Sequence, residues 1–340
     1  MSRPPTFTPP PCATPRTLHT ARGDFAILDA LPPKTTEGTE DTKGTASTGA
    51  AQGAESRKGT GNTGDTAGTV LLLPGFTGSK EDFIALLEPL AAAGYRAVAV
   101  DGRGQYESPG PDDEAAYAQE ELARDVLAQA AALREAPADA PGPHGEAHRP
   151  PRLHLLGHSL GGQIARAAAL LEPRAFASLT LMSSGPAAIT PAQQSRAKIL
   201  ADALAALSMD VVWQAMRAMD PPPPEDTDTG GAKAGGGDDS EALRARWLRH
   251  NPAQLIATSK QLSTEPDRVA ELAAAALPTH VISGESDDTW PVPLLDDMAR
   301  RLHAHRTVIQ GADHSPNTDR PEETAAALIS FWNHLGDITS

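Results

Sequence analysis

The sequence is poor in cysteine, in basic residues and in long apolar runs. Cys12 is the one cysteine in 340 residues, so an intramolecular disulfide and a thiolate metal site are both excluded. No stretch of about 18 apolar residues occurs, which argues against a membrane-spanning helix. Residues 1–5 lead into further prolines and threonines, not into the apolar segment of a secretory signal. From these absences we expect a protein of the cytoplasm without stable membrane insertion.

The deficit of basic residues bears on the partners of the protein. Lys and Arg total 29 against 44 Asp and Glu, which gives a formal net charge of -15. Nucleic acid phosphates and anionic membrane surfaces would repel such a protein. We therefore expect a small-molecule substrate and no nucleic acid partner, whereas the sequence does not determine the oligomeric state.

Glycine and proline, at 29 and 31 residues, are abundant for a globular protein. Much of this excess lies in three stretches that lack any apolar period. Segments of that composition cannot bury enough surface to offset the entropy lost on ordering. We expect surface loops without regular structure at residues 34–68, 136–151 and 221–239.

Elsewhere, short apolar runs alternate with longer amphipathic ones, which is typical of βαβ units with parallel strands. The sequence thus predicts an α/β fold with a mostly parallel central sheet flanked by helices. We expect strands at Val70–Leu73, Ala97–Val100, Leu153–Leu156, Ser178–Met182, His280–Ser283 and Thr307–Ile309. We expect helices from Ser79 to Ala93, at Glu114–Glu135, at Leu160–Leu171 and at about residues 322–335.

The chain between the fourth and fifth of these strands is far longer than a crossover connection needs. We therefore expect an inserted helical cap at residues 186–276, with the flexible loop 221–239 inside it. Core segments at 69–185 and 277–340 would flank this cap. Residues 1–68 would hold an N-terminal leader, early strands and the Thr/Gly-rich insertion.

The first part of the expected cap, Gln193–Met219, carries an apolar stripe at spacings of three and four residues. Such spacing places the side chains on one face of a helix. The stripe can line an acyl-binding pocket or pack the cap against the sheet, and the two roles do not exclude each other. Its members are Met209, Val212, Trp213, Met216 and Met219.

The strongest chemical motif is Gly157-His158-Ser159-Leu160-Gly161, between an apolar strand and an Ala-rich helix. This is the Gly-x-Ser-x-Gly pattern of a sharp strand-to-helix turn, which holds the serine hydroxyl clear at the end of the sheet. The helix that follows points its free N–H groups at the same place and favours an anionic intermediate. Ser159 is therefore the candidate nucleophile.

A serine hydroxyl needs a base to remove its proton, and the chain offers 11 histidines. His314 lies in a loop between the last expected strand and the last helix, at the edge of the sheet where sites assemble. His158 is too close in sequence to fold its ring onto the hydroxyl of Ser159. We expect His314 to be the general base.

The imidazole needs a carboxylate that fixes its tautomer. Asp287 and Asp288 follow the strand that ends at Ser283, and we choose Asp287 while Asp288 remains open. In an alternative arrangement, the acid follows the preceding strand, which ends at Met182. The loop after Met182 has no carboxylate, so this arrangement is excluded.

The tetrahedral intermediate needs hydrogen-bond donors placed at its oxyanion. We expect these to be the backbone N–H groups of Phe76, in the turn Pro74-Gly75-Phe76, and of Leu160. Such a mechanism requires no metal or organic cofactor, and no cluster of ligating residues in the sequence suggests one.

Five segments together resemble the α/β-hydrolase superfamily over about residues 68–336, and their chain order of serine, aspartate and histidine is that of its members. The segments are Leu73–Ser79, Asp101–Gly104, Gly157–Gly162, Gly284–Asp287 and Gly311–Ser315. Members usually have a His-Gly pair at the oxyanion turn, where this chain has Pro74-Gly75. The resemblance implies that Asp101–Gly104 is a structural loop beside the site, to which we assign no catalytic role.

Similar enzymes are carboxylesterases, monoacylglycerol-type lipases, thioesterases or peptidases with a small helical cap. Haloalkane dehalogenases and epoxide hydrolases of this fold use an aspartate nucleophile, and Ser159 argues against both. We expect hydrolysis of a carboxylic ester, thioester or amide of a small molecule or lipid through an acyl-serine intermediate. The alternatives are an acyltransferase or perhydrolase with the same triad, and a catalytically quiet ligand-binding protein.

Overall fold

The computed structural model describes residues 3–33, 66–135, 152–219 and 238–338. Most of the three low-complexity stretches, at 34–65, 136–151 and 221–237, lies outside the described residues. Their ends are corrected by the structure, because residues 66–68 lead into a strand at Gly68 and residues 238–239 begin a helix. In the described part of the chain, no helix combines the length and the apolar composition that crossing a bilayer requires.

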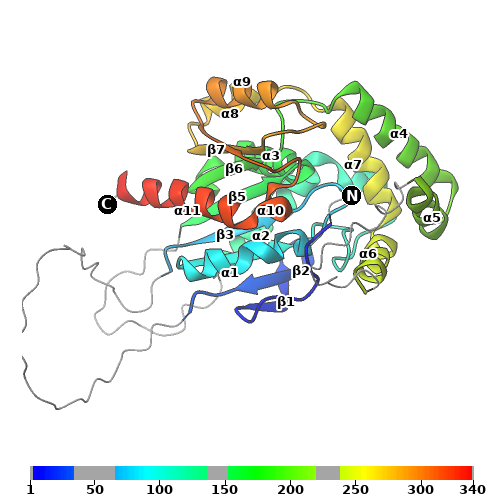
Figure 1. Ribbon diagram of the computed structural model, residues 1–340, viewed down its shortest axis with the longest axis horizontal. Coiled ribbons are helices and arrows are strands. Elements are labelled where there is room, and N and C mark those ends of the chain that lie inside the picture. Colours follow the sequence, from blue (N-terminus) through cyan, green and yellow to red (C-terminus); the bar gives the residue numbers. More distant parts are fainter. Residues whose placement is uncertain (1–2, 34–65, 136–151, 220–237, 339–340) are drawn as a thin grey trace, which may run out of the picture.

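An eight-stranded sheet forms the centre of the molecule (Figure 1). The strand order is β1-β2-β4-β3-β5-β6-β7-β8. The first two strands run antiparallel to their neighbours, and all the others pair in parallel. The prediction of a mostly parallel sheet is therefore confirmed. The strands are Ala13–Thr20, Gly23–Ala30, Gly68–Leu73, Tyr95–Val100, Leu153–His158, Ser178–Met182, Thr279–Gly284 and His305–Ile309, numbered β1 to β8.

The central strands are apolar along their whole length because both faces of the sheet are covered. Every residue of β3, β5, β6 and β7 is buried. All six strands that the sequence predicts are present; β6 has the predicted bounds, and each of the other five is longer by one or more residues. The edge strands β1 and β8 expose much of their length, so their sequences carry little apolar signal.

Helices cover the two faces of the sheet in two groups (Figure 1). One face carries α1 (Ile84–Ala92) and α11 (Pro321–Ile338), which contact each other. The other carries α2 (Gln119–Glu135), α3 (Leu160–Leu171), α8 (Val269–Ala274) and α9 (Val292–Leu302), with α3 in contact with both α2 and α8. Two separate apolar clusters fill these two layers.

Two predicted helices are interrupted in the structure. The helix expected at Glu114–Glu135 is a 3₁₀ turn, η2 (Glu114–Tyr117), followed by α2, because Ala118 adopts an extended backbone conformation with ψ 143°. The helix expected after Ser79 begins with η1 (Lys80–Phe83), whose capping box joins Ser79 and Asp82, and continues as α1. Two further short turns are η3 (Pro173–Ala175) and α10 (Pro316–Asp319).

The segment inserted between β6 and β7 begins with four helices gathered at one end of the sheet (Figure 1). They are α4 (Pro191–Ala206), α5 (Met209–Met219), α6 (Asp238–Arg249) and α7 (Pro252–Thr264). The stretch Gln193–Met219 therefore spans parts of two helices, since the extended backbone at Leu207 ends α4.

The members of the apolar stripe lie on α5. Two of them pack against other helices of the inserted segment and not against the sheet, and a third lines a cavity. Val212 and Trp213 are buried in a small apolar cluster with Trp247 of α6, which holds α5 and α6 together. Met216 lines a cavity at the end of the sheet, whereas Met219 is 76% exposed.

Candidate active site

Ser159 lies at the turn between β5 and α3, and its backbone is in the left-handed region, with φ 54° and ψ -120°. A non-glycine residue seldom adopts this conformation, and it persists here because the surroundings leave no alternative. A Cβ atom at Gly157 would lie 2.1 Å from the carbonyl oxygen of Gly161, and one at Gly161 would lie 2.4 Å from that of Leu73. The glycines on either side of Ser159 are therefore required by close backbone approach.

His314 reaches Ser159 from the loop between β8 and α10. Its Nε2 atom is 3.0 Å from Oγ of Ser159, and its side chain is 27% exposed at the floor of the cavity. The indole of Trp290 stacks on the imidazole at a centroid distance of 6.2 Å. This contact limits the orientations that the ring of His314 can take.

Asp287 lies in the loop after β7, on the side of the His314 ring opposite Ser159. Its Oδ2 atom is 2.9 Å from Nδ1 of His314, and its side chain is fully buried. Its Oδ1 atom accepts hydrogen bonds from the backbone N–H groups of Thr289 and Trp290, at 2.8 and 3.1 Å. Three hydrogen-bond donors thus compensate the burial of this carboxylate.

The neighbouring Asp288 points away from His314. Its carboxylate is 69% exposed and accepts a hydrogen bond from Gln193 at 2.7 Å, with Arg196 at 3.5 Å. Both partners lie on α4, at the rim of the cavity. Of the two aspartates that the sequence left open, the structure brings Asp287 to the histidine.

The backbone N–H groups of Phe76 and Leu160, the two expected oxyanion donors, belong to residues that lie next to Ser159. Leu160 is the first residue of α3, and Phe76 follows Gly75, whose Cβ position would be 3.3 Å from Cβ of Ser159. Within the described residues, neither N–H donates a hydrogen bond to another protein group. Both donors therefore remain available next to the serine hydroxyl.

His158, which is too close in sequence to act as the base for Ser159, contacts the loop of His314 instead. Its ring is buried, and its Nε2 atom is 2.9 Å from the carbonyl oxygen of His314. Because a carbonyl oxygen only accepts, Nε2 must carry the proton and donate it. Burial, and next the nearby His314 imidazole, lower the pKa of His158 to about 4, so its ring is neutral at ordinary pH. This hydrogen bond ties the serine turn to the loop that carries His314.

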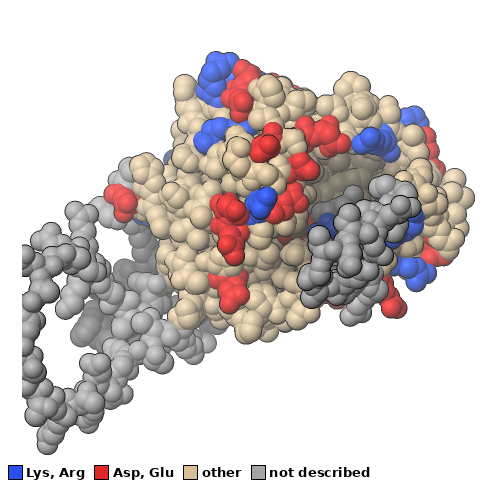
Figure 2. Space-filling model, viewed as in Figure 1, with Lys and Arg blue, Asp and Glu red and all other residues tan. Residues whose placement is uncertain are grey.

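A cavity of about 500 Å³ opens above Ser159. Helices α4 to α7 contribute much of its apolar wall, and the segment before α4 and the turn after β3 contribute the rest. Apolar lining residues are Phe76, Ile189, Ala197, Leu200, Met216, Trp247 and Leu262. Figure 2 shows a hollow on this face of the molecule, with acidic and basic side chains along its rim.

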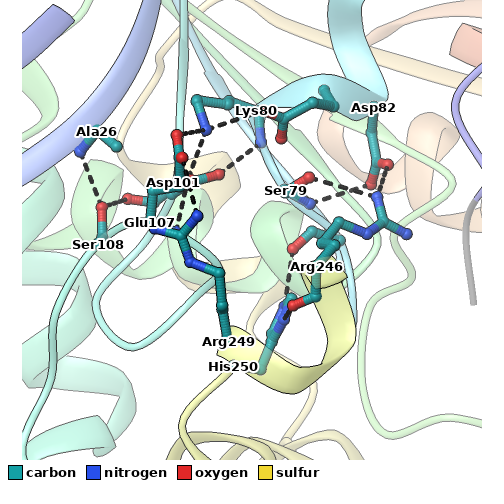
Figure 3. Close-up of polar contacts among 12 residues, drawn as sticks. Ala26, Ser79, Lys80, Asp82, Asp101, Glu107, Ser108, Arg246, Arg249 and His250 are labelled. Atoms are coloured by element: carbon teal, nitrogen blue, oxygen red, sulfur yellow. Dashed lines mark hydrogen bonds and ion pairs between the residues drawn. The ribbon is translucent and has the colours of Figure 1, made fainter. Parts of the chain in front are cut away.

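A buried polar network connects the turn Gly75–Gly78 with helix α6 (Figure 3). The guanidinium of Arg246 pairs with Asp82 at 2.7 Å, and both side chains are fully buried. Nε2 of His250 lies 3.1 Å from the carbonyl oxygen of Gly78. The inserted segment is thereby attached to the loop that carries Phe76. Sequence patterns gave no sign of this network, because its members are separated by more than 160 positions.

No group of three or more His, Cys, Asp or Glu side chains within residues 3–33, 66–135, 152–219 and 238–338 is arranged to hold a metal ion. The polar groups around Ser159 are instead the imidazole of His314, the carboxylate of Asp287 behind it, and the backbone N–H groups of Phe76 and Leu160.

A parallel sheet with a serine at a strand-to-helix turn, and with histidine and aspartate on the loops of later strands, is the architecture of α/β hydrolases. The chain belongs to the alpha/beta hydrolase family, whose model matches residues 70–327.

Two curated proteins are similar to parts of the chain. Over 115 residues it is 38% identical to a protein named "putative carbamate hydrolase RutD" of Variovorax paradoxus, a stretch that covers 34% of this chain and 37% of that protein. Over 188 residues it is 29% identical to the pimeloyl-[acyl-carrier protein] methyl ester esterase of Aeromonas hydrophila, covering 54% and 71% of the two chains. The chain thus spans little more than a third of the length of the first relative.

Among solved structures, a thermophilic esterase from Thermogutta terrifontis superposes with a TM-score of 0.63, over 95% of this chain and 99% of that one. The two sequences are 19% identical, so this likeness establishes the fold alone.

Proposed function

We propose that the protein is a serine hydrolase that cleaves a carboxylic ester of a small molecule or lipid through an acyl-serine intermediate. The observation that carries the proposal is the continuous chain of contacts from Oγ of Ser159 through the imidazole of His314 to the buried carboxylate of Asp287. In this proposal Ser159 is the nucleophile, His314 the general base, and Asp287 the group that orients the base.

The reaction begins when Oγ of Ser159 attacks the carbonyl carbon of the ester while Nε2 of His314 takes the hydroxyl proton. Asp287 accepts the Nδ1 proton of the ring in a hydrogen bond and stabilises the imidazolium. The carbonyl oxygen becomes an oxyanion, which the N–H groups of Phe76 and Leu160 stabilise. When the intermediate collapses, His314 gives its proton to the departing alkoxide.

Water then completes the cycle. It attacks the acyl-serine carbonyl, His314 removes its proton, and the carboxylic acid leaves as Ser159 regains its hydrogen. The same acyl-enzyme can pass its acyl group to an alcohol, an amine or a peroxide. An acyltransferase or perhydrolase activity would therefore use the same residues, and acceptor competition distinguishes it from hydrolysis.

The walls of the cavity favour an acyl substrate. The seven apolar lining residues enclose space that suits an aliphatic chain, while Gln193, Arg196 and Asp288 form a polar rim. We propose that helices α4 to α7 act as the cap that sets acyl length. The names of the relatives, an esterase acting on a methyl ester and a carbamate hydrolase, support a carbonyl substrate with a small leaving group.

The test uses p-nitrophenyl esters of graded acyl length with the wild type, Ser159→Ala and Ser195→Ala. Ser195 is an exposed serine on α4 and serves as the matched control. We expect Ser159→Ala to lose at least about 10³-fold in kcat, since only binding and the oxyanion donors remain. Ser195→Ala should match the wild type.

The rate of ester turnover and the uptake of a fluorophosphonate label together distinguish the candidate functions. A fluorophosphonate label and ester turnover that both disappear in Ser159→Ala support the hydrolase. A wild type that takes up label but releases no product, unless an alcohol or amine is added, supports an acyltransferase instead. A wild type that neither reacts with the label nor turns over any ester contradicts the proposal and favours a ligand-binding protein.

A further inference from the structure

The peptide bond between Gly75 and Phe76 is held by its carbonyl group. The oxygen of Gly75 accepts a hydrogen bond from the N–H of Gly78 at 3.1 Å and another from Nε2 of Gln105 at 2.9 Å. In a planar trans peptide, the C=O and N–H bonds point in opposite directions. Fixing the carbonyl towards Gln105 therefore directs the N–H of Phe76 to the opposite side. Rotation of this peptide would turn the carbonyl oxygen, in place of the donor, towards that side.

Gln105 itself has almost no freedom. Its side chain is buried, and Oε1 accepts the N–H of Gly102 at 2.9 Å. One end of the amide faces a donor and the other faces a carbonyl acceptor, which fixes which atom is nitrogen. A Cβ atom at Gly102 would lie 2.8 Å from Oε1, so glycine is required there for this arrangement.

The loop that carries Gln105 is braced at both ends (Figure 3). The carboxylate of Asp101 accepts hydrogen bonds from the N–H and Nζ of Lys80 and from the N–H of Glu107, at 2.7, 2.9 and 3.2 Å. Oγ of Ser108 donates to the carbonyl oxygen of Asp101 at 2.8 Å and accepts the N–H of Ala26 at 2.9 Å. These hydrogen bonds hold the loop, and with it Gln105, in place beside Gly75.

We propose that Gln105 is a positioning residue for acyl transfer, which holds the Gly75–Phe76 peptide so that the N–H of Phe76 faces the oxyanion. The inference rests on the proposed function, since it assumes an oxyanion at Ser159. The hydrogen bond from Gln105 also polarises the peptide, which makes its N–H a stronger donor. Phe76 supplies the donor, and Gln105 acts through it without touching the substrate.

The test compares the wild type with Gln105→Leu, which removes the donor, and with Gln105→Glu, which places a carboxylate opposite the carbonyl oxygen. Gln129→Leu is the matched control, because Gln129 on α2 is buried and lies at the same small cavity as Gln105 without bonding to the turn. Each protein is first titrated with the fluorophosphonate, so that kcat is expressed per reactive serine. The substrate is the p-nitrophenyl ester that the wild type prefers.

We expect Gln105→Leu to lower kcat by about 10- to 100-fold, since complete removal of an oxyanion donor costs about 10²- to 10³-fold. KM should change by less than about twofold, because the ground-state carbonyl gains little from this donor. The Ki of a trifluoromethyl ketone, whose adduct carries an oxyanion, should rise by the same factor as kcat falls. Gln105→Glu should lose at least as much, and Gln129→Leu should match the wild type.

A Gln105→Leu variant that keeps kcat within about twofold of the wild type, or whose ketone Ki does not follow kcat, overturns the positioning role. A wild type without labelling or turnover overturns the proposed function itself, and this inference with it. The two failures are therefore distinguishable.

Discussion

The buried ion pair between Asp82 and Arg246 provides the sharpest test of how the inserted segment is attached to the core. Asp82 lies in η1, directly after the turn that carries Phe76, and Arg246 lies in α6. Neither side chain is exposed to solvent. Replacing Asp82 by Asn keeps the shape of the side chain and an oxygen for the capping box, but removes the negative charge.

The expected loss of stability follows from the geometry of this ion pair. At a separation of 2.7 Å, with an effective dielectric constant of about 20, the gross attraction is about 6 kcal/mol. Desolvation of the two charges offsets much of this in the wild type. In the variant, however, the guanidinium of Arg246 is still buried and has lost its Asp82 carboxylate. Breaking such a pair from one side typically costs about 3–5 kcal/mol.

The assay is thermal and urea unfolding, with Asp202→Asn as the control. Asp202 pairs with Lys198 on the surface of α4 at a similar distance of 2.7 Å, but the two side chains are 66% and 74% exposed. Loss of this surface ion pair should lower the free energy of unfolding by at most about 0.5 kcal/mol. For Asp82→Asn we expect Tm to fall by roughly 6–20 °C, at about 2–4 °C per kcal/mol. An Asp82→Asn variant that is no less stable than Asp202→Asn would refute the reasoning.

Further predictions concern the triad acid, the cavity and the response to pH. Asp287→Asn should lower kcat by about 10⁴-fold, while Asp288→Asn lowers it far less, as measured with p-nitrophenyl acetate; equal losses would contradict the assignment of Asp287. Leu200→Trp should reduce kcat/KM for the octanoate ester relative to the butyrate ester, and an unchanged ratio would contradict the proposed acyl path. Burial lowers the pKa of four histidines to between about 3 and 4, so between pH 7.5 and 5.5 the unfolded chain takes up protons that the folded chain does not. These histidines are His154, His158, His250 and His280. Burial raises the pKa of Asp101 to about 7, which acts in the opposite direction but for a single proton. Tm should therefore fall from pH 7.5 to 5.5, and a Tm that is constant or rises would contradict this account.

The part of the site that lies close together in the sequence could be predicted from it. The Ser159 turn is specified by an apolar strand, glycines and an Ala-rich helix that are contiguous. His314 and Asp287 could be predicted because they follow strands whose carboxyl ends meet at one edge of a parallel sheet. Their roles in catalysis stay a prediction.

The sequence favours Asp287 as the partner of His314 but does not exclude Asp288. Adjacent residues in a loop point in different directions, and the direction depends on the turn. Here the N–H groups of Thr289 and Trp290 hold Asp287 towards His314 and leave Asp288 at the rim. Neither contact has a signature in residue type or spacing.

Polar contacts between residues far apart in the sequence could not be predicted from it either. Gln105 reaches Gly75 across 30 positions, and Arg246 reaches Asp82 across 164. The resemblance to α/β hydrolases implies a structural role for the loop Asp101–Gly104, but no motif indicates that the next residue donates a hydrogen bond to the carbonyl oxygen of Gly75. The break at Ala118 could not be predicted, because the helical composition continues through a local change of backbone direction.

The central claim is that Ser159 is the nucleophile, and mass spectrometry after fluorophosphonate treatment tests it most directly. Trypsin cuts after Arg152 and Arg166, so Ser159 lies in the peptide of residues 153–166. The account predicts one label per chain, found in this peptide and absent from Ser159→Ala. Label on a different peptide, or labelling that persists in Ser159→Ala, would contradict it.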